Sequence, residues 1–198
     1  MRLPNSAHTS RPWRIHEFTR DFRLEDVWAL PTPGGPNDFP RLVDMIISFD
    51  PFQSSSLAVR TLFSIRRKVG EVLGLDDADE GVGTRVPTLR DRLPADLRDS
   101  APQLDPGPLP FTPLYMTDDE WAAEVANRTV HGVLHFGWVP DETMGYRGQM
   151  AILVKRNGVL GSTYMAAITP FRYIFVYPQM LRDFGRAWRE RSGDPTPA

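Results

Sequence analysis

TVHGVLHFGWV (Thr129–Val139) and YRGQMAILVK (Tyr146–Lys155) are the two stretches that decide the fold. Both are apolar and contain β-branched and aromatic residues, which favour strands. The polar segment Asp141–Gly145 between them is typical of a turn. Phe111–Met116 and a segment near Trp121–Asn127 have the same strand character. The sequence therefore predicts four consecutive strands between residues 111 and 155.

The residues that follow predict a long C-terminal helix. Pro170 and Pro178 each remove a backbone donor, so we expect them to kink or divide this helix. A membrane span is disfavoured, because it would place Arg172 inside the bilayer beside two prolines. A helix packed across the strands is the better interpretation. An apolar stripe at helical spacing supports it, made by Leu160, Tyr164, Ile168, Phe171, Phe175, Leu181, Phe184 and Trp188.

The first half of the chain predicts several smaller elements. Residues 1–13 are polar and aperiodic, which is typical of a flexible arm. Arg14–Phe22 alternates like a strand, whereas Phe39–Phe49 predicts a short buried element of undecided type. Ser56–Leu73 carries its apolar residues on one helical face and predicts a helix.

The remaining segments set the domain bounds. Residues 76–110 form a Pro- and Asp-rich excursion, with a short helix expected around Leu89–Leu97. Residues 192–198 are expected to be a disordered tail. Residues 14–191 then form a single domain. The order of strand, helices, consecutive strands and last helix is typical of an α+β helix-grip domain, in which a curved antiparallel sheet wraps around a long C-terminal helix.

Composition excludes several classes of function. The chain of 198 residues has no cysteine, which excludes a disulfide scaffold, thiolate metal sites and cysteine nucleophiles. Its formal net charge of −2 does not predict a large basic surface for nucleic acid. No secretory signal is visible, so we expect a cytoplasmic location. No dinucleotide-binding or P-loop fingerprint is present, and we expect no cofactor.

Three segments of the sequence resemble a known family. They are EVANRTVHGVLH (Glu124–His135), YMAAITPFR (Tyr164–Arg172) continued by VYP (Val176–Pro178), and LRDRLP (Leu89–Pro94). Over about residues 14–190 the chain resembles an uncharacterised bacterial family of unknown function, associated with the START-like (SRPBCC, birch-pollen-allergen-like) superfamily. The resemblance implies a sheet-and-helix grip around an apolar cavity that binds lipids, sterols, hormones or polyketides. Some superfamily members catalyse cyclisation or dehydration in that cavity.

His131 and His135 are the sharpest candidates for chemistry. Residues four apart on a strand share a face, but these two lie about 13 Å apart along the backbone and cannot hold one metal ion by themselves. Gly132 stands where the zinc-protease helix motif needs a glutamate. The pair can be structural or cavity-lining, can act in binding or acid–base catalysis, or can bind a metal with distant carboxylates. Glu124 can orient an imidazole and raise its pKa, or it can pair with an arginine.

The other candidate ligand-binding residues are expected around the cavity of a helix-grip domain. Arg172 can hold a ligand carboxylate in a bidentate contact, extend to the surface or pair with an aspartate. Asn127 can instead serve the turn before the strand. The predicted ligand-binding set is Asn127, His131, His135, Trp138, Tyr146, Tyr164 and Arg172.

The sequence predicts a protein that binds a small hydrophobic or amphipathic molecule in an internal cavity. The alternative is an enzyme of the cyclase or dehydratase type that uses His131 or His135 as its acid–base group. A second alternative is a structural or regulatory partner of a dehydrogenase-like protein, because relatives of the resembled family occur joined to such domains. We predict no metal, no cofactor, no nucleic-acid partner and no membrane span, and a protein partner stays undetermined.

Overall fold

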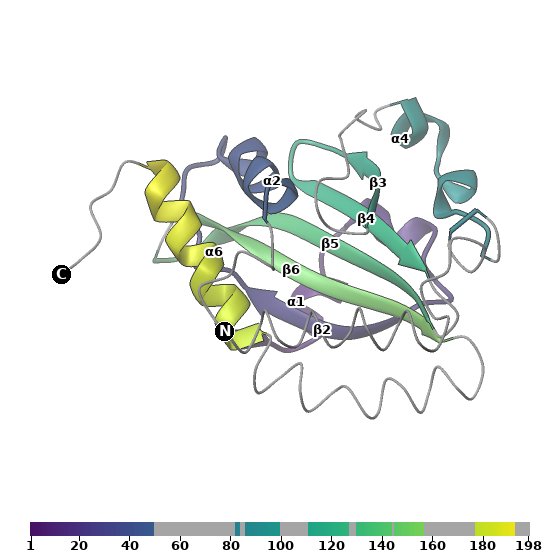
Figure 1. The fold of residues 1–198 in the computed structure, drawn as a ribbon, viewed down its shortest axis with the longest axis horizontal. Coiled ribbons are helices and arrows are strands. Elements are labelled where there is room, and N and C mark those ends of the chain that lie inside the picture. Colours follow the sequence, from purple (N-terminus) through teal and green to yellow (C-terminus); the bar gives the residue numbers. More distant parts are fainter. Residues whose placement is uncertain are drawn as a thin grey trace, which may run out of the picture.

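An antiparallel sheet of six strands is the centre of the fold (Figure 1). The computed structural model describes residues 1–49, 82–83, 86–99, 111–126, 130–143, 145–156 and 177–192. The strand order is β1-β2-β6-β5-β4-β3, and all neighbouring strands are antiparallel. The predicted α+β class is therefore confirmed. The elements are β1 (Arg2–Leu3), α1 (Ser6–Thr9), η1 (Arg14–Glu17), β2 (Arg23–Ala29), α2 (Phe39–Ile47), η4 (Leu89–Arg92), α4 (Ala95–Asp99), β3 (Thr112–Met116), β4 (Glu120–Ala126), β5 (Val130–Asp141), β6 (Gly145–Arg156) and α6 (Tyr177–Ser192).

β5 and β6 are the longest strands, and they pair from Val130↔Arg156 to Asp141↔Gly145. At the turn, the Asp141 carboxylate accepts a hydrogen bond from the backbone N–H of Thr143 at 3.0 Å. Gly145 has a φ of 75°, which glycine adopts without strain. The predicted turn and the four predicted strands of the 111–155 block are confirmed.

Both faces of the sheet are covered, because successive side chains along a strand point to opposite sides. On the first face, called the helix face, Phe136 and Trp138 lie in one apolar core with residues of α2 and α6. Figure 1 shows α2 and α6 on the same side of the sheet. The opposite face, called the histidine face, carries His131, Val133 and His135. Its core includes side chains from η1, η4 and α4.

Phe39–Phe49, whose type the sequence leaves undecided, forms the helix α2. Asp38 precedes the helix and Pro40 lies in its first turn, where a missing backbone donor costs little. The buried residues of α2 face the core of the helix face; they are Phe39, Leu42, Val43, Met45 and Ile46.

The described part of the predicted C-terminal helix is α6. The described part spans Tyr177–Ser192, and it continues without a break from Pro178 to Ser192. Phe184 and Trp188 lie four residues apart and pack into the core of the helix face. Arg41 of α2 lies over the Trp188 ring, 3.8 Å from its centroid, and donates to the Trp188 carbonyl oxygen at 2.6 Å. These contacts hold α2 against α6.

The strand predicted over Arg14–Phe22 is wrong. Residues Arg14–Glu17 form the 3₁₀-helix η1, and the strand β2 begins only at Arg23. The buried residues here are Ile15, Phe18 and Thr19, at the i, i+3, i+4 spacing of one helical face. The Thr19 hydroxyl donates to the Ile15 carbonyl oxygen at 2.6 Å. An apparent alternation of period two therefore concealed a helical turn.

Residues 1–13, predicted to be a flexible arm, instead pack against the sheet. β1 pairs with β2 through Arg2↔Trp28 and Leu3↔Val27. His8 and Trp13 are buried on the histidine face. The polar composition of this segment did not indicate that His8 and Trp13 are buried. His8 hydrogen-bonds to His135 of the sheet, and the Trp13 ring packs against the same His135 ring.

The short helix predicted around Leu89–Leu97 is present as two pieces, η4 and α4. The helix predicted over Ser56–Leu73, the apolar stripe from Leu160 to Phe175 and the tail after Ser192 lie outside the described residues. Within the described ranges, no helix has the length and apolar character that crossing a bilayer requires.

Candidate functional site

A buried carboxylate and two imidazoles form a hydrogen-bonded chain on the histidine face. Glu120 of β4 lies 2.9 Å from His135 Nε2 through its Oε2 atom. His135 Nδ1 lies 3.2 Å from His8 Nε2, which α1 places over the sheet. Glu120 also accepts from the Tyr115 hydroxyl at 2.9 Å and from the backbone N–H of Arg14 at 2.8 Å. The chain therefore connects β3, β4 and β5 to the N-terminal segment.

Three of the four histidines gather at this point. The His8 ring lies edge-on to both His16 and His135, with centroid distances of 4.9 Å in each case. Trp13 packs edge-on against His135 at 5.3 Å. Because His8 and His135 are 0% and 1% exposed, water does not solvate their protons.

Burial sets the charge states of the residues in this hydrogen-bonded chain. It lowers the pKa of His8 to about 2, with further lowering by His135 and His16. For Glu120, burial acts to raise the pKa, but the interaction with His135 and the hydrogen bonds from Arg14 and Tyr115 together outweigh it and hold the pKa below its usual range. Burial and the nearby Glu120 raise the pKa of Tyr115. Glu120 is therefore an ionised acceptor, while His8 stays neutral.

His131 and Glu124 form a second buried pair on the same face. His131 Nε2 lies 2.8 Å from Glu124 Oε2. The Thr88 hydroxyl donates to the other carboxylate oxygen of Glu124, Oε1. The backbone N–H of Leu89 donates to Glu124 Oε2 at 3.1 Å. Phe22 packs edge-on against the His131 ring at 5.0 Å. This pair therefore anchors η4 to β4, as the first chain anchors α1 and η1.

The structure separates the predicted ligand-binding residues. His131 and His135 lie on the histidine face, whereas Trp138 belongs to the core of the helix face and stacks on Tyr146 at 6.5 Å. Trp138 and Tyr146 therefore lie on the opposite side of the sheet from His131 and His135. Of the two alternatives that the sequence leaves open for Glu124, an imidazole partner or an arginine partner, the structure has the imidazole of His131. Asn127, Tyr164 and Arg172 lie outside the described residues. Among the described residues, no group of three or more His, Asp or Glu side chains is arranged to hold a metal ion.

The sequence analysis missed His8, His16, Tyr115 and Glu120. A signal for Glu120 was present, because Glu120 and Glu124 are four apart on one strand, as His131 and His135 are on the next. Residues four apart on a strand share a face, and the register Ala122↔His135 places both glutamates on the face of the two histidines. Nothing in the local sequence indicates that His8 joins them, since its partner is 127 positions away.

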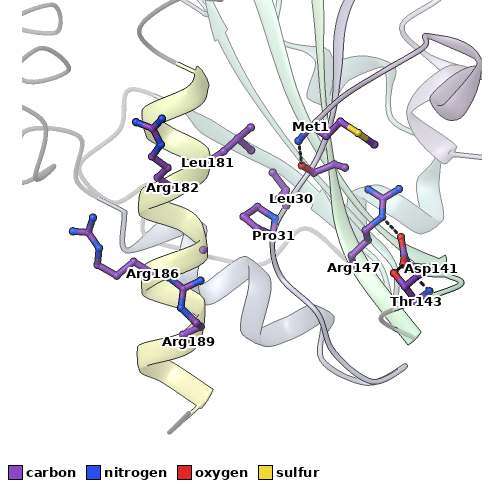
Figure 2. Close-up of a pocket in the computed structure, with 12 residues that line it drawn as sticks. Met1, Leu30, Pro31, Asp141, Thr143, Arg147, Leu181, Arg182, Arg186 and Arg189 are labelled. Atoms are coloured by element: carbon purple, nitrogen blue, oxygen red, sulfur yellow. Dashed lines mark hydrogen bonds and ion pairs between the residues drawn. The ribbon is translucent and has the colours of Figure 1, made fainter. Parts of the chain in front are cut away.

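An open groove lies between α6 and the sheet, and it is called the α6 groove here. Its volume is about 800 Å³. Figure 2 shows α6 along one side, Arg147 of β6 across from it, and Leu30, Pro31 and Leu181 between them. The lining basic residues are Arg147, Arg182, Arg186 and Arg189, and Asp141 is the lining acidic residue. None of the described residues predicted to bind a ligand lines this groove.

The basic groups of the groove differ in their partners. Arg147 donates through Nε to the Asp141 carboxylate at 2.6 Å, and its Nη1 is buried with no hydrogen-bond partner among the described residues. Arg186 lies 3.8 Å from Asp183. Arg182 lies 3.5 Å from the Gln179 side-chain oxygen. The groove therefore joins an apolar floor to a basic rim.

A family model described as "Protein of unknown function (DUF2867)" matches residues 18–179. The chain belongs to the DUF2867 family. The comparisons with curated proteins and with solved structures found no match.

The DUF2867 match spans five of the six strands but not all of the site. It includes β2 to β6 and thus both histidine–glutamate pairs. His8 and His16 lie before the matched residues, and the α6 arginines lie after them. The groove is therefore built by Leu30 and Arg147 from within the DUF2867 match together with α6 residues beyond its end.

Proposed function

We propose that this DUF2867 protein binds a small amphipathic molecule in the α6 groove. The observation that carries the proposal is a groove of about 800 Å³ with an apolar floor and a basic rim. Sites for small molecules commonly have volumes of about 300–1,000 Å³ and combine apolar walls with a few polar groups. Pro31, which is exposed, and Leu181, which is partly buried, offer the tail of such a molecule an apolar surface; Leu30 also lines the groove but is only 1% exposed.

The topology of the sheet supports the finer helix-grip interpretation, which we propose together with ligand binding. β2 pairs with the last strand, β6, and α6 follows and packs on one face of the sheet. In a START-like domain the ligand lies between the sheet and the C-terminal helix. The α6 groove lies between these same two elements.

The enzyme alternative receives less support from the geometry. His131 and His135 are 2% and 1% exposed, and each is hydrogen-bonded to a buried glutamate. A general acid or base must reach the reacting atom of a substrate within hydrogen-bond distance. Burial under η1 and η4 instead favours the structural interpretation of both histidines, which lie on the face opposite to α6.

Titration calorimetry with octanoate and octan-1-ol, which each contain eight carbons, tests the proposal on the full chain. We expect at least one of them to bind as a single molecule per chain. Leu181→Gln replaces part of the apolar floor, so it should weaken binding by about tenfold.

Met180→Gln is the matched control. Met180 is also partly buried on α6 and packs against the same core, but it does not line the groove. We expect it to keep the affinity of the unaltered protein. The proposal is wrong if neither amphiphile binds, or if both variants lose affinity to the same extent.

A further inference from the structure

The geometry of the rim points to the chemical class of the ligand: we propose that its polar end is an oxyanion, a carboxylate or a phosphate group. This inference rests on the proposed function and names what the α6 groove recognises. It commits to a free small molecule that carries one hydrocarbon tail.

Three arginines lie on one side of α6. Arg182, Arg186 and Arg189 are spaced by four and three residues, which brings their side chains to one helical face. Figure 2 shows them along the same helix beside the groove. Together with Arg147, four guanidinium groups and one carboxylate line the groove. The lining thus carries an excess of positive charge in a chain whose formal net charge is −2.

The helix dipole does not account for this pattern. Cations stabilise a helix within its last turn. Arg189 and Arg191 are in the last turn of α6, but Arg182 and Arg186 lie further towards its middle. Asp183 beside Arg186 partly offsets the charge. Arg189 has no carboxylate within ion-pair distance among the described residues, so its charge remains for a ligand.

Arg147 also has a buried guanidinium nitrogen without a hydrogen-bond partner among the described residues. Its side chain is 14% exposed, and its Nε–H is already used by Asp141. The buried Nη1 has no partner among the described residues. A buried donor without a partner costs free energy, which an acceptor supplied by a ligand would recover. The Asp141 contact holds the guanidinium in one orientation, and a guanidinium fork matches the two oxygens of a carboxylate or phosphate.

The apolar floor between these groups explains why the anion should carry a tail. Leu181 lies on α6 beside Arg182, and Leu30 and Pro31 lie between α6 and Arg147. A purely ionic ligand would leave this floor in contact with water. An amphiphile satisfies both parts at once, with its tail on the floor and its oxygens at the arginines.

Calorimetry with four probes that share an eight-carbon chain tests the inference, the carboxylate carbon of octanoate being counted in that chain: octanoate, octyl phosphate, octan-1-ol and octyltrimethylammonium. We expect octanoate and octyl phosphate to bind at least about tenfold more tightly than octan-1-ol, because charge-assisted hydrogen bonds are the stronger class. The cation should bind least tightly. Raising the salt concentration should weaken binding of the two anions more than that of the alcohol.

Arg189→Gln should bring the affinity for octanoate close to that for octan-1-ol, a loss of about tenfold. Arg191→Gln is the matched control, because it makes the same change on the same helix at a residue that does not line the groove. We expect Arg191→Gln to change the affinity for octanoate by less than about twofold. Arg147→Gln should also reduce anion affinity, with circular dichroism as the check that the β5–β6 turn is intact.

The outcomes separate this inference from the proposed function. If octan-1-ol binds as tightly as octanoate and Leu181→Gln weakens both, ligand binding stands and the oxyanion inference is overturned. If no probe binds, both are overturned. Equal losses in Arg189→Gln and Arg191→Gln would overturn the assignment of the anion to the groove. If the protein binds phosphatidylglycerol vesicles and octanoate does not displace it from them, the assignment of a free small molecule to the groove is overturned in favour of a membrane surface.

Discussion

At the level of single residues, burial of the His8 imidazole disfavours its protonated form. Its pKa is lowered to about 2, first by burial and then by His135 and His16, whereas an unfolded histidine titrates at about 6.5. Between these values the unfolded chain binds a proton at His8 and the folded chain does not. The free energy of unfolding should therefore fall as the pH falls below about 6.5, by at most about 1.4 kcal/mol per pH unit from this group.

Urea denaturation of the unaltered protein and of His8→Gln between pH 7 and pH 5 measures this effect. Glutamine keeps a side chain that can hydrogen-bond to His135 but does not titrate. The variant should be less stable at pH 7, and the difference should narrow towards pH 5. Parallel stability profiles for the two proteins would show that His8 is not the group responsible.

Glu120 is the residue whose loss should be felt most in the histidine network. It receives hydrogen bonds from Arg14, Tyr115 and His135 in a buried position. Leaving a buried donor without its acceptor costs about 1–3 kcal/mol. Glu120→Gln puts an amide group where the carboxylate accepts from three donors, so we expect it to lower the free energy of unfolding at pH 7 by about 3 kcal/mol in chemical denaturation.

An exposed carboxylate provides the control for Glu120. Asp21 lies 2.8 Å from both Arg92 and Lys155, but its side chain is 42% exposed. Solvent screens such pairs, so Asp21→Asn should cost less than about 1 kcal/mol. If the two variants lost similar free energy of unfolding, the conclusion that burial makes Glu120 more important than Asp21 would be wrong.

At the scale of elements, Gly137 allows the N-terminal segment to dock on β5. A Cβ atom there would lie 2.6 Å from the Trp13 ring. Gly137→Ala should therefore displace Trp13 together with α1 and η1. We expect a loss of about 1–3 kcal/mol in the free energy of unfolding and faster amide hydrogen exchange in residues 6–17.

Gly132 on the same strand is the matched control. A Cβ at this residue would meet Val125 at 3.5 Å, an ordinary contact. Because alanine loses less backbone freedom than glycine in a strand, Gly132→Ala should keep or raise the stability. If hydrogen exchange of residues 6–17 were unchanged in Gly137→Ala, the docking role of Gly137 would be wrong.

Elements whose pattern is set by neighbours in the chain were predictable. The strands of the 111–155 block are long enough for β-branched and aromatic residues to indicate them. Residues 14–22 were not, because Phe18 and Phe22 are four apart, a spacing that shares one face both in a strand and in a helical turn. The packing of residues 1–13 depends on partners far away in the sequence, and no local pattern reports it.

At the scale of the whole molecule, the same distinction applies to the candidate site. The sequence indicated that His131 and His135 share a face, and it left open whether Glu124 lies beside an imidazole or pairs with an arginine. The structure pairs Glu124 with His131. The sequence analysis placed Trp138 and Tyr146 in the same cavity, although alternation along β5 sends Trp138 to the opposite face from His135. The α6 groove needs α6 and β6 side by side, which is a property of the tertiary fold.

Amide chemical-shift mapping by NMR during an octanoate titration tests ligand binding in the α6 groove, because it locates the ligand on the chain of 22.4 kDa. We expect the largest shifts at Leu30, Arg147 and Gly185, which line the α6 groove. We expect little change at His135 and Glu124 on the histidine face. Largest shifts on the histidine face, with none around the α6 groove, would contradict ligand binding in the groove.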